Sequence, residues 1–165
     1  MLAKKRLVVM AAEFLAEIEV QRAAASFDRL EFAGRDFSGI SIKGVSLQGG
    51  NLSGCDFTES ALVECDLSQA TLAGGTFFRT DFTGSNLRDC VLTGTDLAEA
   101  NLSGADLSGA RMSGVDLQGA VLTGAKIEGA DLTGVDFSQT IMPDGNMHDP
   151  SIHDDMMAHL WNGIV

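Results

Sequence analysis

Large apolar residues recur at every fifth position through most of this 165-residue chain. Starting at Phe27, each step of five residues reaches Leu, Phe, Ile or Met, without an insertion, as far as Met142. An α-helix repeats about every 3.6 residues and a β-strand every 2, so neither regular element explains this spacing. The pattern predicts a fold built from identical five-residue units.

The positions around each large central residue are restricted as well. The residue two before the centre is small in nearly every unit, and the residue two after it is most often Gly. Each unit is therefore expected to be a short extended piece with one large and one small inward side chain, followed by a turn. Pieces this short cannot bury themselves, so they must stack on copies of themselves.

The stretch "NLSGADLSGARMSGVDLQGA", residues 101–120, shows four such units in succession. It resembles the pentapeptide-repeat family, whose signature is A(D/N)Lxx, and the resemblance extends over residues 25–144. It implies an all-β fold, a right-handed quadrilateral β-helix (a β-solenoid) with four pentapeptides in each coil. Six coils at a strand spacing of about 4.8 Å would form a rod roughly 29 Å tall.

The segments on either side of the repeat are expected to cover its two ends, because exposed sheet edges promote aggregation. Residues 1–24 carry apolar side chains at the spacing of one helical face, which predicts a capping helix. At the other end Pro143 and Gly145 break the register. This Met-Pro-Asp-Gly sequence resembles the closures of some bacterial members of the family, and residues 145–165 are interpreted as closure and helix.

The second helix is predicted near residues 150–161, where Asp149 and Pro150 have the character of an N-cap and a first helical residue. Its apolar side either caps the last coil or makes a homodimer contact with a second protomer, and both interpretations remain open. The residues concerned are Ile152, Met156, Met157, Leu160 and Trp161.

The chain is strongly acidic, with a net charge of −12 and a pI near 4.4. Direct nucleic-acid binding requires clusters of Lys and Arg, so it is not expected. An acidic surface can instead attract a basic partner. The N-terminal "MLAKKRLVVMAAEF" has too short an apolar run for a signal peptide, and no stretch is long enough to span a membrane. We expect a cytoplasmic protein.

The residues that usually perform catalysis are scarce or already explained by packing. The chain has no Tyr, its three His (His148, His153 and His159) lie in the tail, and Cys55, Cys65 and Cys90 all occupy the small inward position. These cysteines are expected to be buried structural residues. No phosphate-binding loop, nucleophile elbow or metal motif is found. We therefore expect no enzyme, no cofactor and no metal site.

One face of the predicted rod collects acidic residues, because residues twenty apart stack above one another. An Asp precedes the central residue in five of its six coils. The candidate partner-binding residues on this face are Asp36, Asp56, Asp96, Asp116, Asp136, Glu59, Glu99, Phe78 and Arg79. Two interpretations are open: Asp is the family's usual residue here because its side chain bonds nearby backbone, or the row contacts a partner. Phe78 is an outward aromatic residue beside Arg79, a combination that is typical of interface anchors.

The sequence thus favours a non-catalytic interaction module that presents a rigid face to another protein. The alternative is an acidic DNA mimic that binds a type II topoisomerase such as DNA gyrase, since some members of the family act in this way. The repeat has none of the projecting loops of the enterobacterial topoisomerase-protecting proteins. The net charge of −10 on residues 30–144, spread over roughly 29 Å, amounts to one charge per about 2.9 Å. Duplex DNA has a higher density, one charge per about 1.7 Å.

Overall fold

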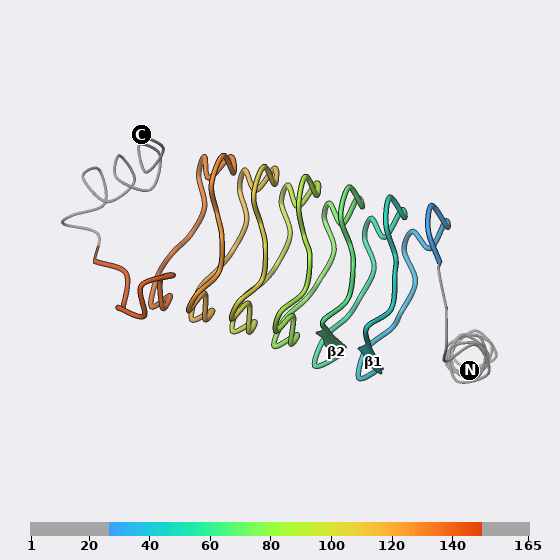
Figure 1. Cartoon of the computed structure of the whole chain (residues 1–165), viewed down its shortest axis with the longest axis horizontal. Coiled ribbons are helices and arrows are strands. Elements are labelled where there is room, and N and C mark those ends of the chain that lie inside the picture. Colours follow the sequence, from blue (N-terminus) through green and yellow to red (C-terminus); the bar gives the residue numbers. More distant parts are fainter. Residues whose placement is uncertain (1–26, 150–165) are drawn as a thin grey trace.

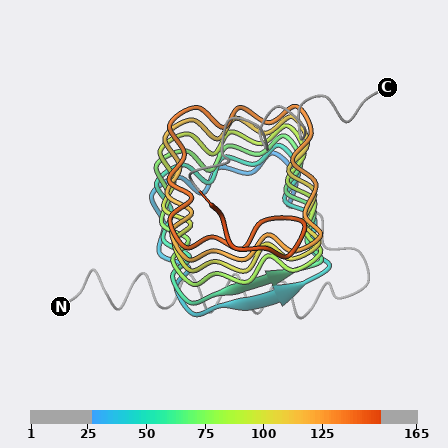
Figure 2. The ribbon, with the colours of Figure 1, turned by 90° about the vertical axis from the view of Figure 1, so that its left-hand side faces the viewer.

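The computed structural model describes residues 27–149, which wind into a stack of similar coils (Figure 1). Viewed along the stack, each coil has a nearly square outline with one pentapeptide on each side (Figure 2). Parallel bridges join residues twenty positions apart, from Glu31 with Asn51 to Val121 with Ile141. The predicted quadrilateral β-helix and its register are confirmed.

The regular strands are short. The strand β1 comprises Ser41–Lys43 and β2 comprises Ala61–Val63, and they pair in parallel with Ile42 opposite Leu62. We name the four sides as follows. The strand face contains the pentapeptides centred on 42, 62, 82, 102, 122 and 142, and the acidic face those centred on 37, 57, 77, 97, 117 and 137. The mixed-charge face has centres 27, 47, 67, 87, 107 and 127, and the glycine face 32, 52, 72, 92, 112 and 132.

Every backbone N–H group of a typical pentapeptide has a partner, as residues 101–105 show. Leu102 and Gly104 donate to carbonyls of the next coil, at 2.7 and 2.9 Å, and Asn101 donates to the previous coil at 2.9 Å. Ala105 closes the corner by donating to the carbonyl of Leu102 at 3.0 Å. The N–H of Ser103 donates to the side-chain Oδ1 of Asn101 at 3.1 Å. The Asp or Asn of the repeat thus satisfies the one backbone donor that the ladder leaves over.

Each corner requires a left-handed backbone conformation at the second residue after the centre. In every pentapeptide centred from Phe27 to Phe137 this residue has a positive φ. Most are Gly, which adopts such angles without steric cost, but Glu99 (φ 56°) and Asp89 (φ 56°) do so as well. The corner is therefore a β-turn with φ > 0 at its second central residue, which accounts for the Gly preference in the repeat.

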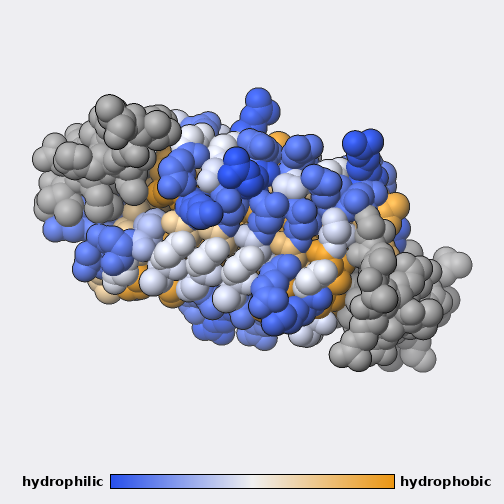
Figure 3. All heavy atoms as spheres, in the orientation of Figure 1, coloured by the Kyte–Doolittle hydropathy of each residue, from blue (hydrophilic) through white to orange (hydrophobic). Residues whose placement is uncertain are grey.

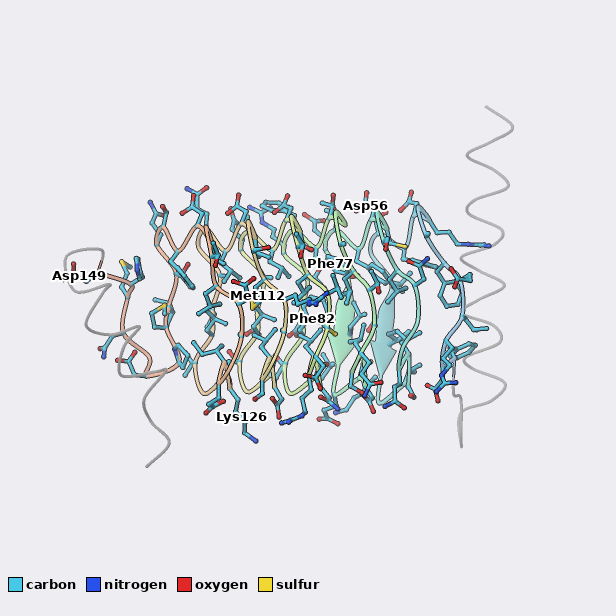
Figure 4. The ribbon with its side chains drawn as sticks, turned by 90° about the horizontal axis from the view of Figure 1, so that it is seen from above. Asp56, Phe77, Phe82, Met112, Lys126 and Asp149 are labelled. Atoms are coloured by element: carbon cyan, nitrogen blue, oxygen red, sulfur yellow. The ribbon has the colours of Figure 1, made fainter. Side chains whose placement is uncertain are left out.

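The core lies inside the square and contains the central and small residues of each unit. Phe77, Phe82 and Met112 point inward, whereas Asp56 and Lys126 point outward (Figure 4). Full burial of a side chain such as Phe77 stabilises the fold by about 1.5–3 kcal/mol relative to exposure. The rings of Phe37, Phe57 and Phe77 are stacked on successive coils, with centroids 4.9 and 5.1 Å apart.

Polar side chains at the small inward position bond to backbone of the neighbouring coil. Thr80 Oγ1 donates to the carbonyl of Phe57 at 2.7 Å, and Cys90 Sγ lies 2.8 Å from the carbonyl oxygen of Leu67. Throughout residues 27–149 no buried side-chain nitrogen or oxygen lacks a partner. All three cysteines are buried and unpaired, which confirms their structural interpretation. Burial raises the pKa of Cys90 to about 12, so its thiol is a poor nucleophile.

Several predictions fall on residues beyond this part of the chain. The helices expected within residues 1–24 and near 150–161, with Ile152, Met156, Met157, Leu160 and Trp161, lie outside the described residues. Over residues 27–149 the chain forms no helix of the length and apolar character that a bilayer crossing requires. The same residues contain no group of three or more His, Cys, Asp or Glu side chains placed to hold a metal ion.

Candidate functional site

The acidic face carries more net charge than any other side of the solenoid. Its pentapeptides contain seven acidic side chains against two arginines, Arg35 and Arg79, whereas each other face has at most two more acids than bases. Parallel bridges join Asp36 to Asp56, and Asp96 through Asp116 to Asp136, so these aspartates follow one another at the strand spacing of about 4.8 Å. The structure brings the predicted row together on one side.

Each aspartate of this row has a structural bond as well. The Oδ1 atoms of Asp56, Asp96 and Asp116 accept the N–H of the residue two positions on, at 2.9, 2.9 and 2.8 Å. Asp136 accepts the N–H of Ser138 in the same way at 2.8 Å, and bonds from Ser138 lower the pKa of Asp136. The backbone-bonding interpretation is therefore correct for these residues.

The second carboxylate oxygen remains available for a partner. For Asp56, Asp96 and Asp116, Oδ2 makes no hydrogen bond or ion pair with another residue of the described range 27–149. All three side chains are half-buried, with the outward orientation that Figure 4 shows for Asp56. The backbone bond fixes the carboxylate while leaving one oxygen to solvent. The two interpretations of the row are thus compatible.

A charge cluster is centred on Arg79, which lies in the same pentapeptide as Thr76, where the row of aspartates is broken. Its Nε donates to Glu99 Oε2 at 2.7 Å, and its Nη1 lies 3.6 Å from Glu59 Oε1. The guanidinium carbon lies 4.8 Å from the ring centroid of Phe78, in a cation–π contact. The bond to Glu99 and its charge, followed by Glu59, raise the pKa of Arg79. Arg79 therefore pairs with two corner carboxylates of its own face, and not with the aspartates of the row.

The sequence analysis named the members of this cluster as candidates but did not predict that they pair with one another, although the signal was present. Glu59, Arg79 and Glu99 occupy the same corner position of three successive coils, twenty residues apart. A search for opposite charges at that spacing identifies the column. The other cation of the acidic face is Arg35, whose guanidinium carbon lies 6.0 Å from the ring centroid of Phe32.

Three cations on the other faces are also paired across coils. On the mixed-charge face Arg88 Nη1 lies 3.2 Å from Asp106 Oδ2, and Lys126 Nζ lies 3.9 Å from the same oxygen. On the strand face Lys43 Nζ lies 2.9 Å from Glu64 Oε1. The side of the described solenoid seen in Figure 3 is largely hydrophilic, and apolar residues show mainly between the polar ones. The acidic face therefore differs from the others in charge.

Comparison with known proteins agrees with this architecture. A right-handed β-solenoid with a strict five-residue repeat defines a narrow class of repeat protein. The model of the pentapeptide repeats family matches residues 25–75, 76–114 and 100–139, with eight copies of the repeat. The chain belongs to the pentapeptide repeat family.

Solved structures with the same fold include a pentapeptide repeat protein from the thylakoid lumen of Arabidopsis thaliana. It is 27% identical, with a TM-score of 0.50, over 74% of this chain and 75% of that one. Rfr23 from the cyanobacterium Cyanothece 51142 is 19% identical (TM-score 0.40; 82% and 97% of the chains), and the plasmid-mediated fluoroquinolone resistance protein QnrB1 is 20% identical (0.38; 84% and 86%). No curated protein sequence matches the chain.

Proposed function

We propose that this protein is a non-catalytic interaction module whose acidic face binds a basic surface of a protein partner. The observation that carries the proposal is the geometry of Asp56, Asp96 and Asp116, in which one oxygen is held by backbone and the other is available. The stacked Phe rings beneath and the hydrogen-bonded ladder hold these carboxylates in fixed positions. Because such groups lose little freedom on binding, they favour specific recognition.

The proposal is tested by removing charge from the row without removing its backbone bonds. In the triple variant Asp96→Asn, Asp116→Asn and Asp136→Asn, each side chain keeps an Oδ1 acceptor. The control variant Asp66→Asn, Asp81→Asn and Asp131→Asn loses the same charge from the other three faces. These three residues also accept the N–H two positions on, at 2.9, 2.9 and 3.1 Å.

Partners are captured from an extract of the source cells at low and at high salt, with wild-type and variant proteins compared. We expect the wild type and the control to retain the same partner and to lose it at high salt. The row variant should bind it more weakly and with a flatter salt dependence. Equal retention by both triple variants would reject the acidic face. In that case Phe78→Ala is the next variant to compare, since Phe78 lies in the only break of the row.

A more specific candidate is the acidic DNA mimic directed at a type II topoisomerase such as DNA gyrase. The carboxylates available along the rod axis support it, because a protein that binds duplex DNA neutralises the phosphate charges with Lys and Arg side chains. We expect the wild-type protein to inhibit gyrase supercoiling and the row variant to inhibit it less. No inhibition at micromolar protein would end this candidate and leave the interaction module standing. We place the proposed interaction in the cytoplasm.

A further inference from the structure

In the last described corner of the solenoid, the residue with the left-handed conformation lies one position later than in all the corners before it. In the pentapeptide centred on Met142 the left-handed conformation moves from the second to the third residue after the centre, Gly145, with φ 85°. Gly145 still donates to the carbonyl of Met142, at 2.8 Å, but Met142 also donates to the carbonyl of Asn146, at 2.7 Å. This is the geometry of a hairpin, in which a turn is followed by a left-handed Gly.

The hairpin turns the chain back along the strand it has just left. Met147 pairs antiparallel with Ile141, and His148 donates to the carbonyl of Thr140 at 2.7 Å. Figure 2 shows these last described residues (red) crossing the end of the stack instead of starting another coil. In this position the side chain of Met147 is 63% exposed.

The reversal leaves part of the last coil without a neighbour. On the mixed-charge and glycine faces, the N–H groups of Ile127, Gly129, Leu132 and Gly134 have no acceptor in the described range. One coil earlier, the equivalent N–H groups of residues 107, 109, 112 and 114 all donate to the next coil, at 2.7 to 2.9 Å. The edge therefore presents four donors spaced for one more pair of pentapeptides.

The residues that follow keep the repeat register on which such a pair depends. The pentapeptides GNMHD (145–149) and PSIHD (150–154) place Met147 and Ile152 twenty residues after Ile127 and Leu132. Asn146 occupies the position of the repeat's Asp or Asn. Asp149 occupies the corner position, where Asp89 adopts a φ of 56°.

We propose that this open edge binds residues 145–149 of the same chain as the first pentapeptide of a seventh coil, in exchange with the observed hairpin. The exchange requires the left-handed conformation to move from Gly145 to Asp144. It gives up the bonds of the hairpin, satisfies the edge donors of Ile127 and Gly129 and buries Met147.

Two cysteine pairs distinguish the arrangements. Lys126→Cys with Asn146→Cys places the thiols on outward positions of adjacent strands in the seventh coil. Ile141→Cys with Met147→Cys places them on the paired residues of the hairpin. Paired strands bring Cα atoms within the range that a disulfide tolerates, about 4.4–6.8 Å. The natural cysteines are buried, so they do not compete for oxidation.

Each double variant is oxidised at low protein concentration and its disulfides are mapped by mass spectrometry. The proposal expects an intramolecular disulfide in both. A disulfide only in the 141–147 variant, or in neither, would overturn it. A 126–146 disulfide only between chains would show that a second copy fills the edge, and would overturn it too.

A change at the corner supplies an independent readout. Asp144→Gly with Gly145→Ala favours the left-handed conformation at 144 and disfavours it at 145, and Ala at 145 suits the small inward position. We expect this variant to raise the yield of the 126–146 disulfide at least several-fold and to lower that of the 141–147 disulfide. Amide exchange at residues 127 and 129 should slow toward that of 107 and 109. Unchanged yields and exchange would reject the exchange between hairpin and coil.

Discussion

The Asp89 carboxylate lies over the Cα of Gly109, one coil further along the mixed-charge face. A Cβ built on Gly109 would meet Asp89 Oδ1 far inside normal contact distance. Both residues are corner residues with positive φ, 56° and 71°. Arg29, Glu64 and Glu99 also have a Gly twenty residues later. A Cβ built on that Gly would meet the side chain of the earlier residue at a longer distance. A corner side chain thus lies in the space left by the missing side chain of a Gly in the next coil.

This contact predicts that glycines of the same repeat position differ in their tolerance of Ala. Gly109→Ala and Gly104→Ala both place Ala in a left-handed conformation, at a cost of about 1–2 kcal/mol. Nothing lies within 4 Å of a Cβ at Gly104, so Gly109→Ala should lower the unfolding free energy further, by the small cost of turning the exposed Asp89 carboxylate aside. Adding Asp89→Gly should remove that excess, a coupling measurable by urea unfolding of the single and double variants. Equal costs at 104 and 109 would contradict the prediction.

The inward and outward positions of a pentapeptide should differ sharply in their response to charge. Leu102 is fully buried, so Leu102→Asp places an unpaired carboxylate in the core at a cost of several kcal/mol. Ser103→Asp, one residue away and outward, should cost less than about 1 kcal/mol. Thermal melts followed by circular dichroism measure both variants. Equal shifts in Tm would mean that the assignment of the two positions is wrong.

The hydrogen bond that the N–H of Ala98 donates to Asp96 Oδ1, at 2.9 Å, predicts opposite results for two substitutions. Asp96→Asn keeps the Oδ1 acceptor and relieves repulsion from Asp116, so stability should be unchanged or slightly increased. Asp96→Ala removes the acceptor and should cost about 0.5–1.5 kcal/mol, the usual net worth of one hydrogen bond. Urea unfolding separates them. A loss of stability in Asp96→Asn as large as in Asp96→Ala would show that charge, rather than the backbone bond, matters at this position.

The buried thiol of Cys90 predicts a loss of stability in alkali. Burial raises its pKa to about 12 in the folded state, whereas the thiol of the unfolded chain ionises near 8.5. The folded protein therefore retains a proton that the unfolded chain releases, so this contribution to stability is present below pH 8.5 and declines above it. Cys90→Ala should make the decline between pH 8.5 and 10.5 less steep, as measured by unfolding free energy against pH.

Ala is a suitable replacement because Ala70 and Ala110 occupy the equivalent position in the adjoining coils. The folded protein should also resist thiol labelling at pH 8 and become labelled in urea. An unchanged alkaline slope in Cys90→Ala, or rapid labelling of Cys90 in the folded protein, would contradict the prediction.

The sequence by itself determined the fold, the register and the direction of each repeat side chain. Every fifth residue is large and apolar, so only one arrangement buries Leu102 and its equivalents while placing Asp96 outside. Cys55, Cys65 and Cys90 were likewise predictable as buried residues, because they share a position with Ala and Gly. The candidate site was found to the same extent, since a twenty-residue period places the aspartates in one row.

Only the tertiary structure decided how these side chains are used. Within residues 27–149, one oxygen of Asp116 accepts a backbone hydrogen bond and the other does not. This difference depends on the side-chain rotamer, which the spacing of residues in the sequence does not specify. That Arg79 lies against Phe78 and bonds Glu99, instead of reaching an aspartate, depends on the direction in which a corner side chain leaves the coil. At the last corner, residues 145–154 continue the repeat register, yet the described chain turns back after Gly145. A repeat pattern specifies which residues can pair, whereas the turn conformation that is lower in free energy decides whether they do.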